Sequence, residues 1–152
     1  MPNISIAQES PRQDEVVRLI EELDAYLGNL YPAESNHLLD LESLVRPDIR
    51  FFVARRSGTV VGCGAVRLDP EGYGEVKRMF VHPTARGGQI GRRLLERIED
   101  EARTTGLPLL RLETGIHQPE AIALYRKQGF AERGPFGPYD PDPLSLFMEK
   151  AL

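Results

Sequence analysis

The 152-residue chain contains one cysteine, three histidines and no tryptophan. A single thiol excludes a disulfide within the chain, so the fold must depend on an ordinary hydrophobic core. Cys63 lies between two glycines in an apolar stretch, with no local histidine to lower its pKa, which favours a buried structural thiol over a nucleophile. His37 and His82 are isolated, and no second ligand follows either of them at metal spacing. The sequence therefore predicts no metal site.

Long hydrophobic runs and an excess of positive charge are also missing. No apolar run is long enough to span a bilayer, and residues 1–15 lack the basic and apolar regions of a signal peptide. The formal net charge of −4 argues against nucleic acid or an anionic membrane as the main partner. Because the composition shows no break, we expect one domain, residues 1–152, in a cytoplasmic protein.

Residues 75–102 predict a strand, a glycine-containing loop and a helix. The strand part, residues 75–81, is short and apolar, and it must end before Pro83, which removes a ladder donor. Gly87 and Gly88 precede the helix and leave its first backbone amides uncovered at the positive end of the helix dipole. Such a terminus attracts phosphate, although two glycines can also form no more than a tight turn. The apolar face of the predicted helix consists of Ile90, Leu94, Leu95, Ile98 and Ala102.

The loop has neither the lysine and hydroxyl of a nucleotide-triphosphate loop nor the three glycines of a dinucleotide fingerprint. Arg86-Gly-Gly-Gln-Ile-Gly91, after a strand that ends in Val-His-Pro, resembles instead the pyrophosphate-binding motif of the GNAT family of N-acetyltransferases. That motif is Arg or Gln, two residues, Gly, one residue, and then Gly or Ala. The chain matches at Arg86 and Gly91 and departs at Gln89, where the family usually has glycine. If Gln89 keeps a negative φ inside the first helical turn, its N–H can still point at an anion, so we expect the departure to weaken the site and not to remove it.

Two helices are expected in the first third of the chain. Ser10, followed by Pro11 and Gln13, predicts a helix opening with the serine hydroxyl as its cap, and apolar residues then recur at helical spacing over residues 16–30. A second, short helix is expected in SNHLLDLESLV, with Ser35 or Asn36 as its cap. The connection at residues 31–37 either lines a substrate entrance or is a plain surface loop. The apolar face of the short helix is predicted to consist of Leu38, Leu41, Leu44 and Val45.

The strands follow from β-rich runs and turn residues. A hairpin at Ser57 and Gly58 joins residues 51–55 to residues 60–68, a second turn leads to residues 75–81, and residues 109–114 follow the long helix as a parallel strand. Residues 4–7 predict an edge strand. A short helix from Pro119 ends at Gly129, and residues 130–133 and 144–149 predict two closing strands. Together with the GNAT resemblance, these elements imply an α/β (α+β) fold: a mixed, mostly antiparallel central sheet of about six to seven strands with a splayed parallel pair, flanked by about four helices.

The resemblance covers roughly the last two thirds of the chain and implies acetyl-CoA as the cosubstrate. The pantetheine arm is expected in the gap of the splayed pair, where it would hydrogen-bond to strand backbone. The segment AIALYRKQGF is similar to a later family motif, and Gln118 stands where many members carry an asparagine that binds the arm. The cofactor-binding residues that the resemblance implies are Met79, Phe80, Val81, Arg86, Gly87, Gly88, Gln89, Ile90, Gly91, Arg92 and Gln118.

Two catalytic residues are implied in the same way. Glu75 aligns with a strand glutamate that is the general base in several members, acting directly or through water; otherwise it is a surface or salt-bridged residue beside Lys77. Tyr125 matches a tyrosine near the thioester sulfur and would be the general acid, or else it is a core residue. Glu113 and His117 either meet the substrate or belong to the loop that enters the following helix.

The ending DPLSLFMEKAL, with LETG and PAESNHLLDLESL, resembles a bacterial branch of the family that acts on small molecules. The resemblance implies direct transfer of an acetyl group from acetyl-CoA to the amine of a small metabolite, with no nucleic acid or membrane partner. Homodimer formation through the last strands stays open. So do transfer of a different acyl group, transfer to a hydroxyl, and a non-catalytic CoA-binding sensor or assembly module, which the departures at Gln89 and Gln118 make conceivable.

Overall fold

The structure is a computed structural model that describes residues 3–35, 40–87 and 89–152. Its strands are β1 (Ile4–Gln8), β2 (Ile49–Arg56), β3 (Thr59–Asp69), β4 (Tyr73–Val81), β5 (Leu109–Gly115), β6 (Ala131–Arg133) and β7 (Ser145–Ala151). Its helices are α1 (Asp14–Leu30), α2 (Leu41–Leu44), α3 (Ile90–Thr104) and α4 (Pro119–Lys127), with short 3-10 helices η1 (Ala33–Ser35) and η2 (Pro83–Ala85). Within these ranges the strands form one seven-stranded sheet in the order β1-β2-β3-β4-β5-β7-β6.

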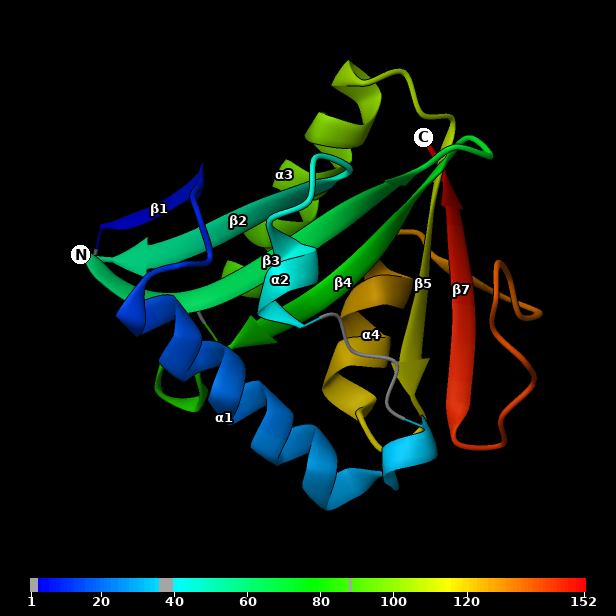
Figure 1. The fold of residues 1–152 in the computed structure, drawn as a ribbon, viewed down its shortest axis with the longest axis horizontal. Helices are drawn as coiled ribbons and strands as arrows, with labels where there is room; N and C mark the ends of the chain where they lie inside the picture. The colour runs from blue at the N-terminus through cyan, green and yellow to red at the C-terminus, as the bar shows by residue number, and fades with distance from the viewer. Residues whose placement is uncertain (1–2, 36–39, 88) are drawn as a thin grey trace.

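The connectivity confirms the predicted mixed sheet (Figure 1). Strands β1 to β4 pair antiparallel in sequence order, and α3 then crosses over to place β5 parallel to β4. The hairpin between β2 and β3 turns at Ser57 and Gly58, which both have positive φ (49° and 87°), the conformation that matches the twist of two antiparallel strands. No helix in the described ranges is long and apolar enough to cross a membrane.

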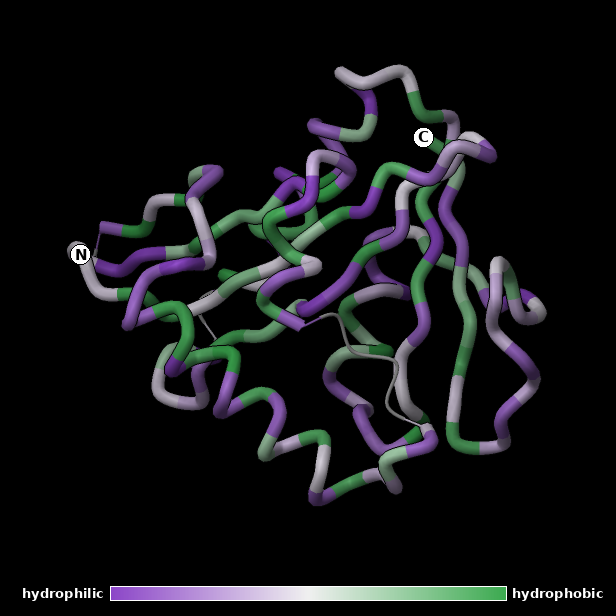
Figure 2. Tube along the Cα trace, in the orientation of Figure 1, coloured by the Kyte–Doolittle hydropathy of each residue, from purple (hydrophilic) through white to green (hydrophobic). Residues whose placement is uncertain are grey.

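The sheet is covered on both faces, and each face has its own core. Neighbouring residues of β2 point to opposite sides: Phe51 and Val53 pack with α1, whereas Phe52 and Ala54 pack with α3. Along α1, hydrophobic and hydrophilic residues interleave with the period of a helix that buries one side (Figure 2). Packed side chains therefore cover both faces of the sheet, and a cavity that passes between its strands must lie where two neighbouring strands separate.

Such a separation occurs between β4 and β5. Their pairing starts at Gly74 and Leu110 and reaches only Val76 and Leu112, although β4 continues to Val81. In the same region β4 makes a bulge against β3 at Arg78, which has a positive φ of 55°. The bulge redirects the second half of β4 away from β5. The predicted splayed parallel pair is thus confirmed.

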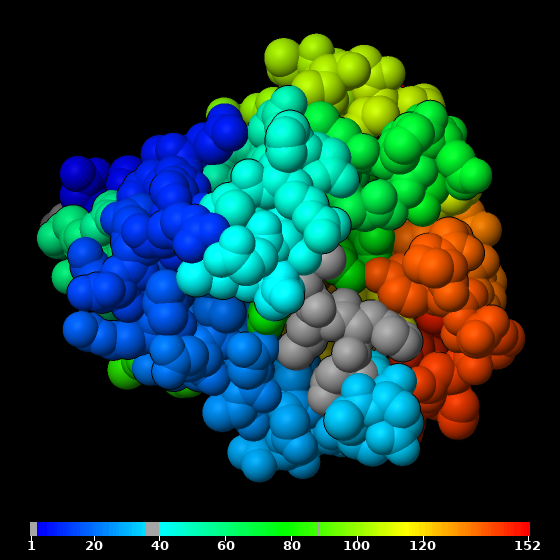
Figure 3. Space-filling view, in the orientation of Figure 1, coloured from blue at the N-terminus to red at the C-terminus, as the bar shows by residue number. Residues whose placement is uncertain are grey.

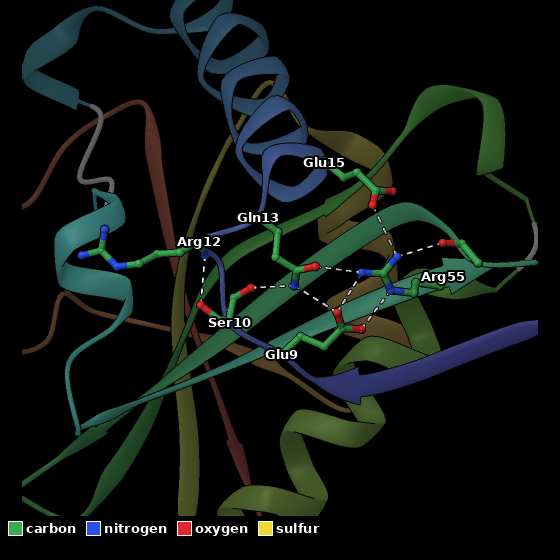
Figure 4. Close-up of polar contacts among 7 residues, drawn as sticks. Glu9, Ser10, Arg12, Gln13, Glu15 and Arg55 are labelled. Atoms are coloured by element: carbon green, nitrogen blue, oxygen red, sulfur yellow. Dashed lines mark hydrogen bonds and ion pairs between the residues drawn. The ribbon is translucent and has the colours of Figure 1, made fainter.

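The predicted opening of the first helix at Ser10 is wrong, because α1 begins at Asp14. Figure 4 shows Ser10 and Gln13 in the segment that precedes the helix. The Ser10 hydroxyl accepts a hydrogen bond from the backbone N–H two residues later and does not cap α1. Gln13 occupies the N-cap position, and its side chain joins two charged groups, donating to Glu9 Oε1 (3.0 Å) and accepting from Arg55 Nη2 (3.0 Å). These bonds tie the segment before the helix to β2, so helical geometry starts only after it.

The predicted cap of the second helix is also wrong. Asp40 caps α2, and its carboxylate accepts a hydrogen bond from the Ser43 N–H (2.8 Å), which lowers the pKa of that carboxyl. Ser35 belongs to η1 instead. Val45, expected on the apolar face, is 40% exposed because the helix ends before it. The alternative cap Asn36, together with His37 and Leu38, lies outside the described residues.

Candidate active site

A cleft of about 650 Å³ lies beside the splayed half of β4, between the start of α3 and α4. Most of the predicted cofactor-binding residues line it, and so does Tyr125. The described members of that set in the lining are Met79, Phe80, Val81, Arg86, Gly87, Gln89, Ile90, Gly91, Arg92 and Gln118. Gly88 lies outside the described residues, and Glu75 is not part of this lining. The fold thus gathers residues from three separate segments around one cleft.

At the start of α3, the condition of a negative φ at Gln89 is not met. Gln89 has φ 62° and ψ 21°, so it is a left-handed N-cap residue and not a negative-φ residue of the first turn. The chain must reverse direction between η2 and α3, and a left-handed residue closes that turn, which explains the preference for glycine at this position. The first helical hydrogen bond joins the Arg93 N–H to the Gln89 carbonyl (3.1 Å). The backbone N–H groups of residues 90–92 come before this first bonded N–H in the chain and lie at the positive end of the helix dipole.

Two exposed arginines flank this helix start. Arg92 donates from Nε to Gln89 Oε1 (2.9 Å) and pairs with Glu96 (3.0 Å). Arg86 donates from Nε to the Val81 carbonyl (3.2 Å) and lies over the Phe80 ring at 5.8 Å. Positive side chains and helix amides together make this end of the cleft suitable for an anion such as a diphosphate.

Tyr125 occupies the inner end of the cleft, on α4. Its ring is buried in the core, 6% exposed, and packs edge-on against Phe130 at 5.8 Å. Its hydroxyl makes no hydrogen bond with any residue that the structure describes, and burial raises the pKa of Tyr125 above its ordinary value. The phenol therefore stays protonated at neutral pH and can donate a hydrogen bond or a proton into the cleft.

A second, smaller cavity of about 100 Å³ lies on the α1 side of the splayed strands. Charged and hydroxyl side chains from β4, β5 and β7 line it, including Lys77, Arg78, Glu113 and Ser145. The two cavities share the four residues Leu23, Met79, Gln118 and Tyr125. They therefore meet where β4 and β5 part. Figure 3 shows one face of the molecule, on which α1, the α2 segment and the loop before β7 are exposed.

Glu75 lines neither cavity and is 2% exposed. Its carboxylate accepts a hydrogen bond from the Tyr139 hydroxyl (2.5 Å) and lies 3.3 Å from Lys77 Nζ and 3.6 Å from Arg67 Nη2. Burial, followed by the Glu75 charge, raises the pKa of Tyr139, so that phenol remains a donor. This placement fits the salt-bridged alternative. A base role for Glu75 would need Lys77 or a water molecule to connect it with the smaller cavity.

Tyr31 is a site residue that the sequence reasoning did not single out. It follows α1, is 8% exposed and lines the smaller cavity, which agrees with the substrate-entrance alternative for residues 31–37 at this position. Burial raises the pKa of Tyr31, so its hydroxyl is neutral. The available signal was an aromatic residue directly before Pro32, which is too common to indicate a site.

Cys63 is buried, as predicted, and burial raises the pKa of its thiol to about 12. The thiol donates a hydrogen bond to the Arg78 carbonyl (3.2 Å) and therefore gives the backbone at the bulge of β4 a hydrogen-bond partner. Among the described residues, no group of three or more His, Cys, Asp or Glu side chains could hold a metal ion.

Comparisons with known proteins match nearly the whole chain. Residues 16–130 match the Acetyltransferase (GNAT) family. The sequence is 79% identical to IAA acetyltransferase of Azospirillum brasilense, over 100% of both chains. The crystal structure of a Klebsiella pneumoniae protein assigned as an acyl-CoA N-acyltransferase aligns with a TM-score of 0.83 and 42% identity, over 98% of this chain and 97% of that one. PaiA N-acetyltransferase of Thermoplasma acidophilum, solved with coenzyme A, has the same fold, with a TM-score of 0.76 and 20% identity over 99% of each chain.

Proposed function

The chain belongs to the acetyltransferase (GNAT) family, and on this basis we propose that it is an N-acetyltransferase that transfers an acetyl group from acetyl-CoA to the amine of a small molecule. The observation that carries the proposal is the meeting of a large cleft and a small cavity at Tyr125. Direct transfer needs two substrates side by side, with a proton donor at the point of contact. The larger cleft would hold the cofactor and the smaller cavity the acceptor.

The residues of the larger cleft suit acetyl-CoA, which supplies an activated acetyl thioester when it is bound. The amides of residues 90–92 and the guanidinium groups of Arg86 and Arg92 would bind the diphosphate. The β4 backbone at residues 79–81 would hold the arm as an added strand would be held, since β5 does not pair with this part of β4. A cavity of about 650 Å³ is within the usual range for a cofactor site.

Transfer forms a bond between the acceptor nitrogen and the acetyl carbon and breaks the bond from that carbon to sulfur. Tyr125 would give its proton to the departing sulfur, because its phenol is protonated and lies at the junction. A backbone N–H at Phe80 or Val81 would polarise the acetyl carbonyl. Glu75 would accept the amine proton through Lys77 or water, since its carboxylate lines neither cavity.

Several finer assignments belong to the same proposal. IAA is the first acceptor to test, because the relative at 79% identity is named IAA acetyltransferase. We propose one domain over residues 1–152, since strands from Ile4 to Ala151 join a single sheet. Catalysis would need no nucleic acid or membrane, and a homodimer would pair through the sheet edge at β6, which sedimentation analysis would test.

The decisive experiment is titration calorimetry with acetyl-CoA, followed by measurement of thiol release with IAA and over a set of amines and amino acids. We expect binding, and release that depends on an acceptor. A protein with no affinity for any coenzyme A derivative would refute the proposal. Binding without release from any acceptor would instead support a CoA-binding sensor. The thioester that gives the strongest protection against thermal unfolding would identify the acyl group.

A further inference from the structure

Tyr31 joins α1 to the turn between β5 and α4, although it is separated from Gln118 by 87 residues. Its ring stacks on His117 with a centroid distance of 5.6 Å and an interplanar angle of 20°. Its hydroxyl lies against Gly115 so closely that a Cβ at that position would be 1.8 Å from the oxygen. The turn therefore accepts the tyrosine only because residue 115 has no side chain.

The direction of each hydrogen bond in this contact is determined by backbone groups. The His117 N–H donates to the Tyr31 hydroxyl oxygen (3.0 Å), and the Tyr31 hydroxyl donates to Gln118 Oε1 (3.2 Å). The Gly115 N–H also donates to Gln118 Oε1 (3.2 Å). A backbone N–H can only donate, so the oxygen of the Gln118 amide, and not its nitrogen, must face Gly115 and Tyr31.

This orientation leaves the Gln118 nitrogen as the group that the side chain can offer to a ligand. Gln118 lines both cavities, and its Nε2 makes no hydrogen bond with any described residue. Two N–H donors at this place are suited to a carbonyl oxygen, and the pantetheine arm of coenzyme A carries two amide carbonyls. An amide that is already held in position loses less conformational freedom when it binds.

We propose that Tyr31 is a positioning residue, which holds the Gln118 amide so that Nε2 donates to an amide carbonyl of the pantetheine arm. The inference rests on the function proposed above. It also connects the two substrates, because Tyr31 lines the smaller cavity while Gln118 lines both. An acceptor that contacts Tyr31 would therefore act on a hydrogen bond that supports cofactor binding, and this coupling is reciprocal.

The test compares two ligands on the same variants by titration calorimetry. Coenzyme A contains the arm, whereas adenosine 3′,5′-diphosphate contains the nucleotide and phosphates without it. Tyr31→Phe keeps the ring on His117 and removes the hydroxyl. We expect about five-fold weaker binding of coenzyme A, the effect of one neutral hydrogen bond, and unchanged binding of the diphosphate. A folding defect would weaken both ligands.

A second variant tests the amide directly. Gln118→Glu keeps an oxygen for Gly115 and Tyr31 but replaces the N–H donors by a second oxygen. Coenzyme A should therefore bind at least five-fold more weakly, because the variant loses at least one neutral hydrogen bond to the arm. Because both changes act on one interaction, the double variant should bind no more weakly than Gln118→Glu alone. Tyr73→Phe is the matched control, since Tyr73 is 2% exposed and lines neither cavity; both ligands should bind it as they bind the wild type.

Three results would overturn the inference. They are unchanged coenzyme A affinity in Tyr31→Phe, an equal loss for both ligands, and additive losses in the double variant. Wild-type protein that binds no coenzyme A at all would identify the proposed function itself as the error, and the inference would end with it.

Discussion

Gln89 offers a direct test of the conformation at the start of α3. An L-residue in the left-handed region is strained, and Gln89 has φ 62°. The informative comparison is between Gln89→Gly and Gln89→Ala. Both variants remove the side chain and its hydrogen bonds with Arg92, so those losses cancel. What remains is the backbone preference of glycine relative to alanine.

The expected difference follows from two opposing contributions. The left-handed conformation costs an L-residue about 1–2 kcal/mol, and glycine avoids this cost. Glycine has more freedom in the unfolded chain, which lowers its benefit by about 0.5–1 kcal/mol. Gln89→Gly should therefore be more stable than Gln89→Ala by about 1 kcal/mol, or about 2–4 °C in Tm for a chain of this size.

Urea unfolding and thermal melts of the two variants would measure this difference. The control is the same pair of substitutions at Gln128, which follows α4 with a φ of −87°. At a negative φ the order should reverse, with alanine more stable than glycine by about 0.5–1 kcal/mol. Equal stability of the two Gln89 variants, or a higher stability of the alanine variant, would show that Gln89 does not have the left-handed conformation.

Three further predictions concern the chemistry and the core. Tyr125→Phe should keep the packing against Phe130 and the affinity for acetyl-CoA, while kcat falls about 100-fold or more through loss of the proton donor; an unchanged kcat would reject the acid role. Glu75→Gln should lower kcat about 100-fold or more through loss of the proton acceptor, provided that circular dichroism shows a folded protein, and an unchanged kcat would exclude Glu75 as the base. Burial raises the pKa of Cys63 to about 12, so the folded state retains a proton that the unfolded chain releases above pH ~8.5. The contribution of this thiol to the free energy of unfolding is present below that pH. It is lost by about 1.4 kcal/mol per pH unit as the pH rises towards 12. In urea unfolding at pH 8, 9 and 10, the free energy of unfolding should therefore fall more steeply with pH in the wild type than in Cys63→Ala.

The sheet and most of the residues that line the larger cleft were predictable because their signals are local. Alternation, turn residues and the helical face at residues 90–102 each depend on neighbours within one or two turns of chain. Helix starts were less predictable. Ser10 and Ser35 are residue types that often cap helices. Contacts of Gln13 with Glu9 and Arg55 hold the segment before α1, so that α1 begins later in the chain than predicted. Asp40, and not Ser35, caps α2.

The sequence by itself determined the order of strands and helices, the family, and the place of the glycine-containing turn before α3, because periodicity and motif are properties of adjacent residues. Only the tertiary structure decided that Gln89 is left-handed, that Lys77, Arg67 and Tyr139 surround Glu75, and that Tyr31 reaches Gln118. Each of these depends on how segments distant in the chain pack together. A local pattern cannot specify such a contact, because its energy exists only once both segments are in place.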